Sequence, residues 1–165
     1  MPRRDDLKTI LVLGSGPIKI GQAAEFDFSG SQAVRALRED GYEVILVNSN
    51  PATIQNDPEM ADKVYIEPLL PDTVRRILEI EKPCALLAGM GGQTALNIAS
   101  ELAHDGSLER IGVELIGSDL DAIDKAEDRE LFNQVCNSIN LPISNAIACN
   151  SMDEVIAAEH TIGYR

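Results

Sequence analysis

Short apolar segments alternate along this chain with stretches of helical periodicity, and this alternation constrains the fold more than any other feature. Strands are expected at residues 9–13, 43–47, 63–66, 84–88 and 114–117, where β-branched and aliphatic residues cluster. Apolar residues at helical spacing predict helices over 29–39, 72–81, 93–104, 120–139 (whole or in two pieces) and 152–159, and 143–149 is a candidate late strand. Strands that are apolar throughout and that alternate with helices indicate parallel pairing, with helices packed on both faces of the sheet.

This pattern predicts an α/β fold with a Rossmann-like, doubly wound and mostly parallel sheet. In such sheets the ligand crevice lies outside the carboxyl ends of the strands. Three unusual loops follow strand ends and are expected to gather along that edge: GSGPIKIGQ (14–22), NSNPATIQNDPEMAD (48–62) and GMGGQTALN (89–97).

The first loop resembles a dinucleotide-binding turn but departs from it. Gly14 and Gly16 fit the GxGxxG spacing, whereas Gly21 comes two positions late and Pro17 removes a backbone N–H donor. The second strand ends in Asn-Ser-Asn, without the carboxylate that would hold a ribose, and the loop lacks the Lys-Ser/Thr ending of a P-loop. NAD or FAD binding is therefore disfavoured, and a purely structural turn remains open.

The segment AAEFDFSG behind this loop carries two carboxylates, Glu25 and Asp27. Asp27 or Ser29 is expected to cap the helix that follows, because acidic and hydroxyl side chains favour helix N-termini. Capping explains Glu25 less well, since apolar residues flank it.

The second glycine loop, Gly89-Met90-Gly91-Gly92-Gln93-Thr94, allows the backbone to approach a ligand or another segment closely. A tight strand-to-helix turn with Thr94 near the cap explains the same residues.

Arg129 is the third feature. If 120–139 is one helix, Arg129 falls on the same arc as the apolar positions 126, 132, 136 and 139, and its charge needs an anion or a carboxylate partner. A structural ion pair, or a helix break at Asp128 that turns Arg129 outward, remains possible.

Composition excludes several classes of partner. The net charge of −13 disfavours nucleic-acid and anionic-membrane surfaces, which require basic patches, and no segment is long enough to span a membrane. Cys84, Cys136 and Cys149 are expected to be reduced, buried thiols of a cytosolic protein. His104 and His160 have no partner at zinc-ligand spacing, so no metal site is predicted.

Taken together and in order, the motifs resemble the start of the carbamoyl-phosphate synthase large chain. The resemblance rests on GSGPIKIGQAAEFDFSGSQAVRAL, VNSNPATIQNDPEMAD, YIEP, GGQTALN and DAIDKAEDR, and it covers nearly all 165 residues. SGSQA, NPATI and GGQTALN match the first of the two homologous halves in that family. Phe28, Lys19 and Arg165 depart from residues usual in the family.

The resemblance implies a glutamine-hydrolysing ligase of the cytoplasm. Its first half uses MgATP to phosphorylate bicarbonate, ammonia from a glutaminase small subunit reaches it through a tunnel, and its second half phosphorylates carbamate. Residues 1–140 would be a Rossmann-like pre-ATP-grasp domain, and 141–165 would begin the connection into an ATP-grasp domain. The Mg or Mn ligands and most ATP contacts would lie in that later domain, so these 165 residues alone are expected to be inactive.

The resemblance also implies residue roles. Arg129 matches the family arginine that contacts ATP from this domain, and Ala23 and Glu25 match positions that line the carbamate passage. The structural glycines of the two loops are Gly14, Gly16, Gly21, Gly91 and Gly92. A stand-alone, non-catalytic nucleotide-binding module and an NAD-binding module are the alternative hypotheses.

Overall fold

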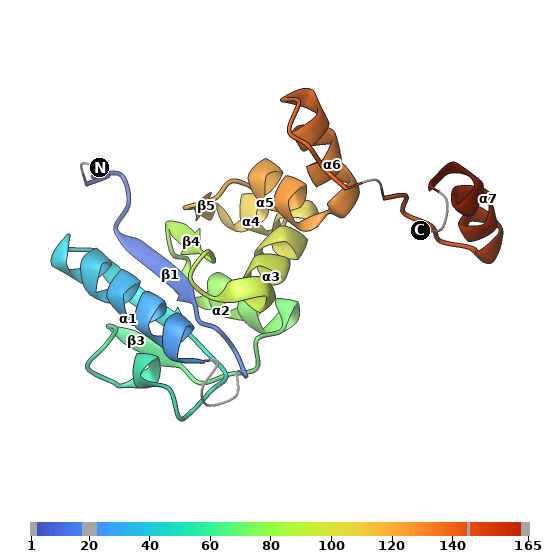
Figure 1. The fold of residues 1–165 in the computed structure, drawn as a ribbon. Helices are drawn as coiled ribbons and strands as arrows, with labels where there is room; N and C mark the ends of the chain where they lie inside the picture. Colours follow the sequence, from blue (N-terminus) through green and yellow to red (C-terminus); the bar gives the residue numbers. More distant parts are fainter. Residues whose placement is uncertain (1–2, 18–22, 145, 163–165) are drawn as a thin grey trace. The chain divides into compact units, whose positions relative to one another are not determined.

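The computed structural model describes residues 3–17, 23–144 and 146–162 of the chain (Figure 1). The chain divides into two compact units, Met1–Ile123 and Asp124–Arg165. The first unit contains the sheet and the helices packed on it.

The first unit alternates strands and helices as the sequence predicts. Its elements are β1 (Thr9–Leu13), α1 (Ala23–Glu39), β2 (Glu43–Val47), the 3-10 helix η1 (Ile54–Asn56), β3 (Lys63–Tyr65), α2 (Pro71–Glu81), β4 (Ala85–Leu87), α3 (Gly92–His104), α4 (Ser107–Ile111), β5 (Glu114–Ile116) and α5 (Leu120–Glu127). The boundary between the two units, after Ile123, falls within α5. The five strands form one sheet in the order β3-β2-β1-β4-β5, and every pairing is parallel. The predicted parallel α/β fold is confirmed.

Alternate residues of the central strands enter two separate cores, because successive side chains of a strand point to opposite faces. On one face Leu11, Ile45 and Leu86 pack against α2 and α3, and on the other Ile10 and Val12 pack with Val34 of α1. Figure 1 shows α1 along one face and α2, α3 and α4 gathered on the other.

The helices of the first unit begin and end for recognisable reasons. Pro71 occupies the first turn of α2, where a missing N–H costs nothing, and Gly41 follows α1 with a φ of +84°.

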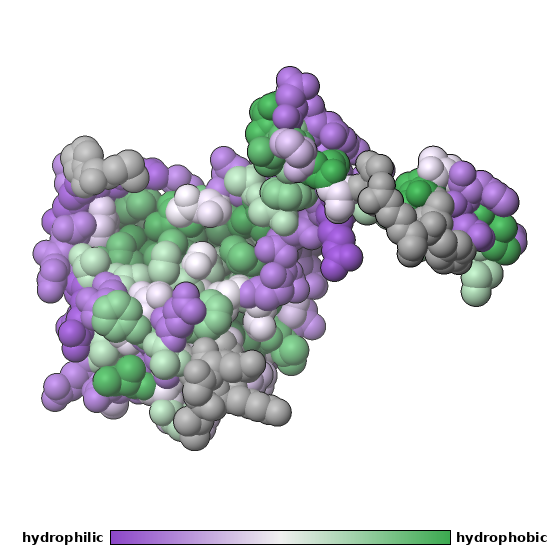
Figure 2. All heavy atoms as spheres, in the orientation of Figure 1, coloured by the Kyte–Doolittle hydropathy of each residue, from purple (hydrophilic) through white to green (hydrophobic). Residues whose placement is uncertain are grey.

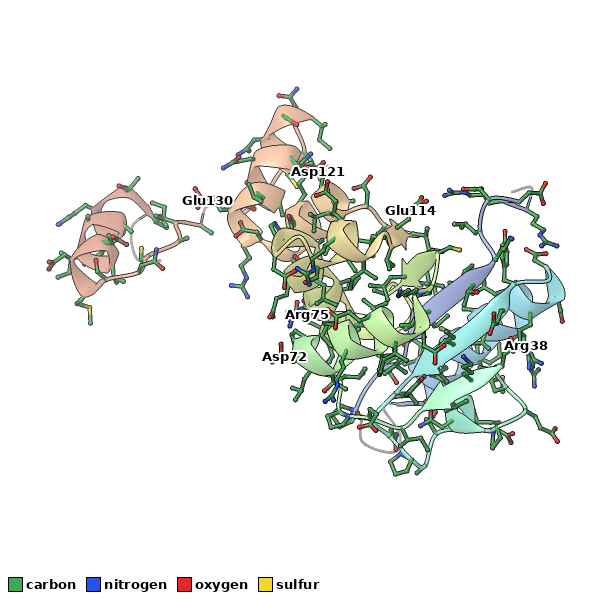
Figure 3. All side chains as sticks on the ribbon, turned by 180° about the vertical axis from the view of Figure 1, so that it is seen from behind. Arg38, Asp72, Arg75, Glu114, Asp121 and Glu130 are labelled. Atoms are coloured by element: carbon green, nitrogen blue, oxygen red, sulfur yellow. The ribbon has the colours of Figure 1, made fainter. Side chains whose placement is uncertain are left out.

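Arg75 joins α2 to the turn before α4 (Figure 3). Its guanidinium forms ion pairs with Asp72 of the same helix and with Asp105 of the turn, and the distance to Asp105 is 2.7 Å.

The start of α1 differs from the sequence-based expectation. The helix begins at Ala23, six residues before the predicted start, so Asp27 lies within it and the predicted cap at Asp27 or Ser29 is wrong. Tertiary contacts explain the longer helix, because Phe26 packs on Gly92 and Gln55 packs on Gly30. These partners are distant in sequence, and local patterning does not show them.

The second unit holds α6 (Arg129–Ser138) and α7 (Met152–Ile162). The 120–139 segment is two helices rather than one, since Asp128 has extended backbone and caps α6 with its carboxylate. The candidate strand at 143–149 is absent from the described residues of that range, which form no sheet pairing.

The three cysteines are unpaired thiols, but only Cys136 is buried. The expectation of three buried thiols is wrong for Cys84 and Cys149, which are half-buried. Hydrogen bonds from the backbone of Thr9 and Lys8 lower the pKa of the Cys84 thiol.

Candidate functional site

The carboxyl ends of β1 and β4 form the topological switch point of the sheet. The chain leaves β1 toward α1 on one face and leaves β4 toward α3 on the opposite face. In open parallel sheets this is the place where a ligand crevice forms. The two glycine loops singled out in the sequence both lie here, at residues 14–16 and 89–92.

The two loops pack directly on each other. A Cβ atom added to Gly91 would stand 2.5 Å from the carbonyl oxygen of Gly14 and 2.6 Å from that of Leu13. A Cβ on Gly92, whose φ is +66°, would stand 3.0 Å from the ring of Phe26. Backbone and an aromatic ring thus occupy space at the switch point, where a dinucleotide fold holds the pyrophosphate.

Asn48 fixes the first loop from the end of β2. Its side chain is completely buried, and its Oδ1 accepts a hydrogen bond from the backbone N–H of Gly16 at 3.1 Å. Gly16 has a φ of +77°, a conformation that glycine adopts without a steric penalty. The amide therefore holds a turn, where a dinucleotide fold would have a ribose-binding carboxylate.

The loop after β2 holds the first turns of α1. The hydroxyl of Thr53 donates to Oδ1 of Asp27 at 2.6 Å, and Nε2 of Gln55 donates to the carbonyl oxygen of Phe26 at 2.9 Å. Gln55 is fully buried against Gly30, where a Cβ would stand 2.7 Å from its carboxamide. We call Thr53, Gln55 and Asp27 the α1 latch.

Sequence reasoning missed the roles of Asn48, Phe26, Thr53 and Gln55, and it assigned Asp27 to capping rather than to the α1 latch. One available signal was the run of amide and hydroxyl side chains directly after a strand, since such groups hydrogen-bond exposed loop backbone. Among the described residues, several buried polar atoms here (Ser15 Oγ, Ser49 Oγ and Asn48 Nδ2) have no hydrogen-bond partner and retain hydrogen-bonding capacity.

The predicted passage residues lie at the start of α1. Glu25 is in its first turn with an exposed side chain, and Ala23 is its first residue. Gly21 and Lys19 lie outside the described residues. The α1 latch therefore holds the turn that carries Glu25.

Arg129 lies in the second unit, as the first residue of α6. Asp128 caps this helix, with its Oδ1 accepting from the N–H groups of Glu130 and Leu131 at 2.8 Å each. Arg129 is exposed, so the interpretation that places it on the apolar side of one long helix is wrong, and the break at Asp128 turns it outward.

The surroundings of Arg129 leave its charge available. It borders a hollow of about 450 Å³ that is also lined by Glu130, Asn133, Gln134, Asn137 and residues 146–148. Among the described residues its guanidinium has no hydrogen bond or ion pair. The guanidinium group of Arg129 is always charged and borders an open hollow, so it is suited to contact an anionic ligand.

The described part of the chain contains neither a metal-ligand cluster nor a membrane-spanning helix. Across the described residues, no three histidine, cysteine or carboxylate side chains are grouped as metal ligands. None of the helices described is both long and apolar enough to cross a membrane.

Comparison with known proteins gives a consistent result. Residues 6–125 match the family model of the carbamoyl phosphate synthase preATP-grasp domain. The chain is 57% identical over 163 residues to the carbamoyl phosphate synthase large chain of Methanothrix thermoacetophila, covering 99% of this chain and 15% of that protein. It is 58% identical over 164 residues to the carbamoyl phosphate synthase large chain, N-terminal section, of Aquifex aeolicus, covering 99% of this chain and 29% of that one.

Solved structures share the fold at much lower identity. The biotin carboxylase domain of Hydrogenobacter thermophilus 2-oxoglutarate carboxylase superposes with a TM-score of 0.66 at 18% identity, over 96% of this chain and 33% of that one. An N5-carboxyaminoimidazole ribonucleotide synthetase superposes with a TM-score of 0.64 at 16% identity, over 95% of this chain and 36% of that one. The chain spans less than a third of the length of the curated relatives described above. From the family match and the identity across 99% of its length, the chain belongs to the carbamoyl phosphate synthase large chain family and corresponds to its pre-ATP-grasp domain.

Proposed function

We propose that this chain is the N-terminal domain of a carbamoyl-phosphate synthase large chain, a ligase that makes carbamoyl phosphate from bicarbonate, ammonia and two MgATP. The observation that carries the proposal is identity of 57% to a full-length relative across 99% of this chain but only 15% of the relative. The domain belongs to the half that forms carboxyphosphate, and residues 141–165 lead into the ATP-grasp domain that follows.

Within this function Arg129 contacts ATP. Three properties support the role: the side chain is exposed, it borders a hollow, and it has no ion-pair partner among the described residues. The Asp128 cap fixes where α6 begins and hence where Arg129 leaves the helix. The guanidinium would neutralise part of the polyphosphate charge, while Mg or Mn is held by carboxylates of the later domain.

Ala23 and Glu25 line the passage by which the unstable intermediate leaves this half. A small side chain keeps such a passage open, and a carboxylate offers hydrogen-bond acceptors along it. The α1 latch supports this role because it holds the helical turn that carries Glu25. Ammonia would come from a glutaminase small subunit, and the free thiols fit a reducing cytoplasm.

The test is to express the full-length gene with its glutaminase subunit and to measure carbamoyl phosphate made from bicarbonate, glutamine and MgATP. The expected result is bicarbonate-dependent ATP hydrolysis by the full chain and none by the 165 residues alone. Formation of carboxyphosphate by the isolated 165 residues would refute this division of labour. A full-length chain with no bicarbonate-dependent ATP hydrolysis would refute the activity itself and favour a non-catalytic nucleotide-binding module.

A further inference from the structure

One face of the sheet carries an apolar hollow that none of the helices described in the first unit covers. It lies on the α1 side over β4 and β5 and has a volume of about 600 Å³. Ile10, Leu37, Tyr42, Leu87 and Ile116 form much of its wall, and the charged residues at its rim are Arg3, Arg4, Asp40, Glu114 and Asp119. Figure 2 shows it as an apolar, hollowed area between α1 and β5. We call it the β4–β5 hollow.

The hollow follows from how the chain crosses between strands. α1 covers β1 and β2, whereas α2, α3 and α4 pack on the opposite face. The connections from β3 to β4 and from β4 to β5 carry α2, α3 and α4 on that opposite face, so neither places a helix on the α1 side of β4 and β5. Leu87 and Ile116, which point to the α1 side, are consequently only partly buried. Parallel strands are stable when both faces are covered, and this face of β4 and β5 is incomplete.

Both arginines at the rim already have partners. The Arg4 guanidinium lies 2.6 Å from Glu114 and 2.5 Å from Asp6, and Arg3 lies over the ring of Tyr42 at 5.4 Å. Small-molecule sites combine apolar walls with polar groups that converge on the ligand. Because the Arg4 guanidinium is already paired with two carboxylates, the hollow fits apolar protein side chains better than a polar metabolite.

The length of the relatives points to the occupant. In the Methanothrix protein the matched segment is 15% of the chain, so most of the protein lies outside it. The Aquifex relative is the N-terminal section of a large chain, and the matched segment is 29% of that section. An N-terminal section by itself therefore contains a large length of chain outside the segment matched here.

We propose that the β4–β5 hollow is covered by a segment of the parent chain that lies downstream of residue 165 and within its first half. This inference rests on the proposed function in one respect, namely that the chain is the first domain of a longer one. The covering segment contributes apolar side chains to Leu87 and Ile116, and it makes this domain's fold depend on the chain that follows.

Photo-crosslinking in the full-length chain tests the proposal. The crosslinker p-benzoyl-phenylalanine replaces Ile116 at the floor of the hollow and, in a second variant, Asp40 at its exposed rim, where a large side chain is tolerated. The matched control replaces Ile80, an exposed isoleucine of α2 on the opposite face of the sheet. Irradiation followed by peptide mass spectrometry identifies the segment reached from each position.

The expected result is that positions 116 and 40 crosslink to shared peptides beyond residue 165 in the first half, and that position 80 does not reach them. Mixing isotopically labelled and unlabelled chains shows whether a crosslink joins one chain or two. Crosslinks to a second copy, to the glutaminase subunit, to residues 124–165 or to the second half would overturn the proposal. Absence of crosslinks from both 116 and 40 would also overturn it, because the hollow would then face solvent. Enzymatic activity is assayed separately, so failure of the covering proposal and failure of the proposed function are distinct results.

Discussion

The backbone of Gly91 lies against the backbone of Gly14, so closely that a Cβ at Gly91 would stand 2.5 Å from the Gly14 carbonyl oxygen. Gly91 follows β4 and Gly14 follows β1, so this contact joins the two loops of the switch point. The glycines serve contact between backbones, and the space between these loops is filled by protein. Ligand contacts of this domain are therefore expected elsewhere, at Arg129 and at the start of α1.

Substitution at this contact is expected to be costly. Gly91→Ala forces backbone atoms apart and should lower the free energy of unfolding by about 1–3 kcal/mol, the usual cost of overpacking. Gly89→Ala is the matched control in the same loop, because its added Cβ meets nothing within 4 Å. Urea denaturation of both variants provides the measurement, and equal midpoints would show that the two loops are not in tight contact.

Glu81 is expected to make stability depend on pH in the acidic range. Hydrogen bonds from Lys63 and from Tyr65 hold the pKa of the Glu81 carboxyl below its usual value. A depressed folded-state pKa gives stabilisation that is present above the unfolded pKa of about 4.3 and is lost as the pH falls through the folded value.

Glu81→Gln should therefore flatten the decline in unfolding free energy as the pH falls below about 5. Glu79→Gln on the same helix is the control, since Glu79 is more exposed and its only ion pair in the described residues, with Arg110, is longer at 3.8 Å. Denaturation midpoints across the acidic range provide the comparison. If Glu79→Gln flattened the profile as much as Glu81→Gln, the Lys63–Glu81–Tyr65 group would not be the cause.

Loss of the Asp128 cap is expected to loosen the start of α6. Asp128→Ala leaves the N–H groups of Glu130 and Leu131 without their carboxylate acceptor and should cost about 1 kcal/mol. Hydrogen exchange of these two amides should accelerate about fivefold. Asp128→Ser retains an acceptor and should restore most of the protection; equal exchange in the Ala and Ser variants would argue against the cap.

Arg129→Ala in the full-length chain is expected to weaken the first ATP half-reaction and to spare the second. Loss of a charge-assisted contact to phosphate costs about 1.5–3 kcal/mol, which corresponds to about a tenfold or greater rise in the KM for ATP. Bicarbonate-dependent ATP hydrolysis and ATP synthesis from carbamoyl phosphate report the two halves separately. Arg76→Ala, at an exposed arginine of α2, is the control. Equal losses in both halves would contradict the role assigned to Arg129.

Ala23→Phe in the full-length chain is expected to uncouple the two halves. A phenyl ring at the proposed passage should lower carbamoyl phosphate synthesis while each partial reaction continues. Ala36→Phe places the same side chain on the exposed last turns of α1 and should leave overall synthesis unchanged. An unchanged overall rate in Ala23→Phe would remove the passage role.

The sequence predicted most elements of the sheet unit because its strands are apolar throughout and its helices are amphipathic. The five strands agree with their predicted ranges to within a residue at each end, and Val74, Ile77 and Leu78 form the buried stripe of α2. Predictions failed where partners are remote. The early start of α1 depends on Gln55, Gly92 and the loop after β2. The separation of α5 from α6, an alternative that the sequence left open, follows from the local break at Asp128.

The sequence by itself determined the fold class and the family, because periodicity and ordered motifs are local properties of the chain. Only the tertiary structure decided what the glycine loops do: Gly14 and Gly91 meet across strands that the sequence separates by more than seventy residues, and Asn48 turns its amide onto Gly16. It also decided that Arg129 points outward from a capped helix and that β4 and β5 keep one face incompletely covered. These outcomes depend on contacts between segments that are distant in sequence, and only the packing of the folded chain brings such segments together.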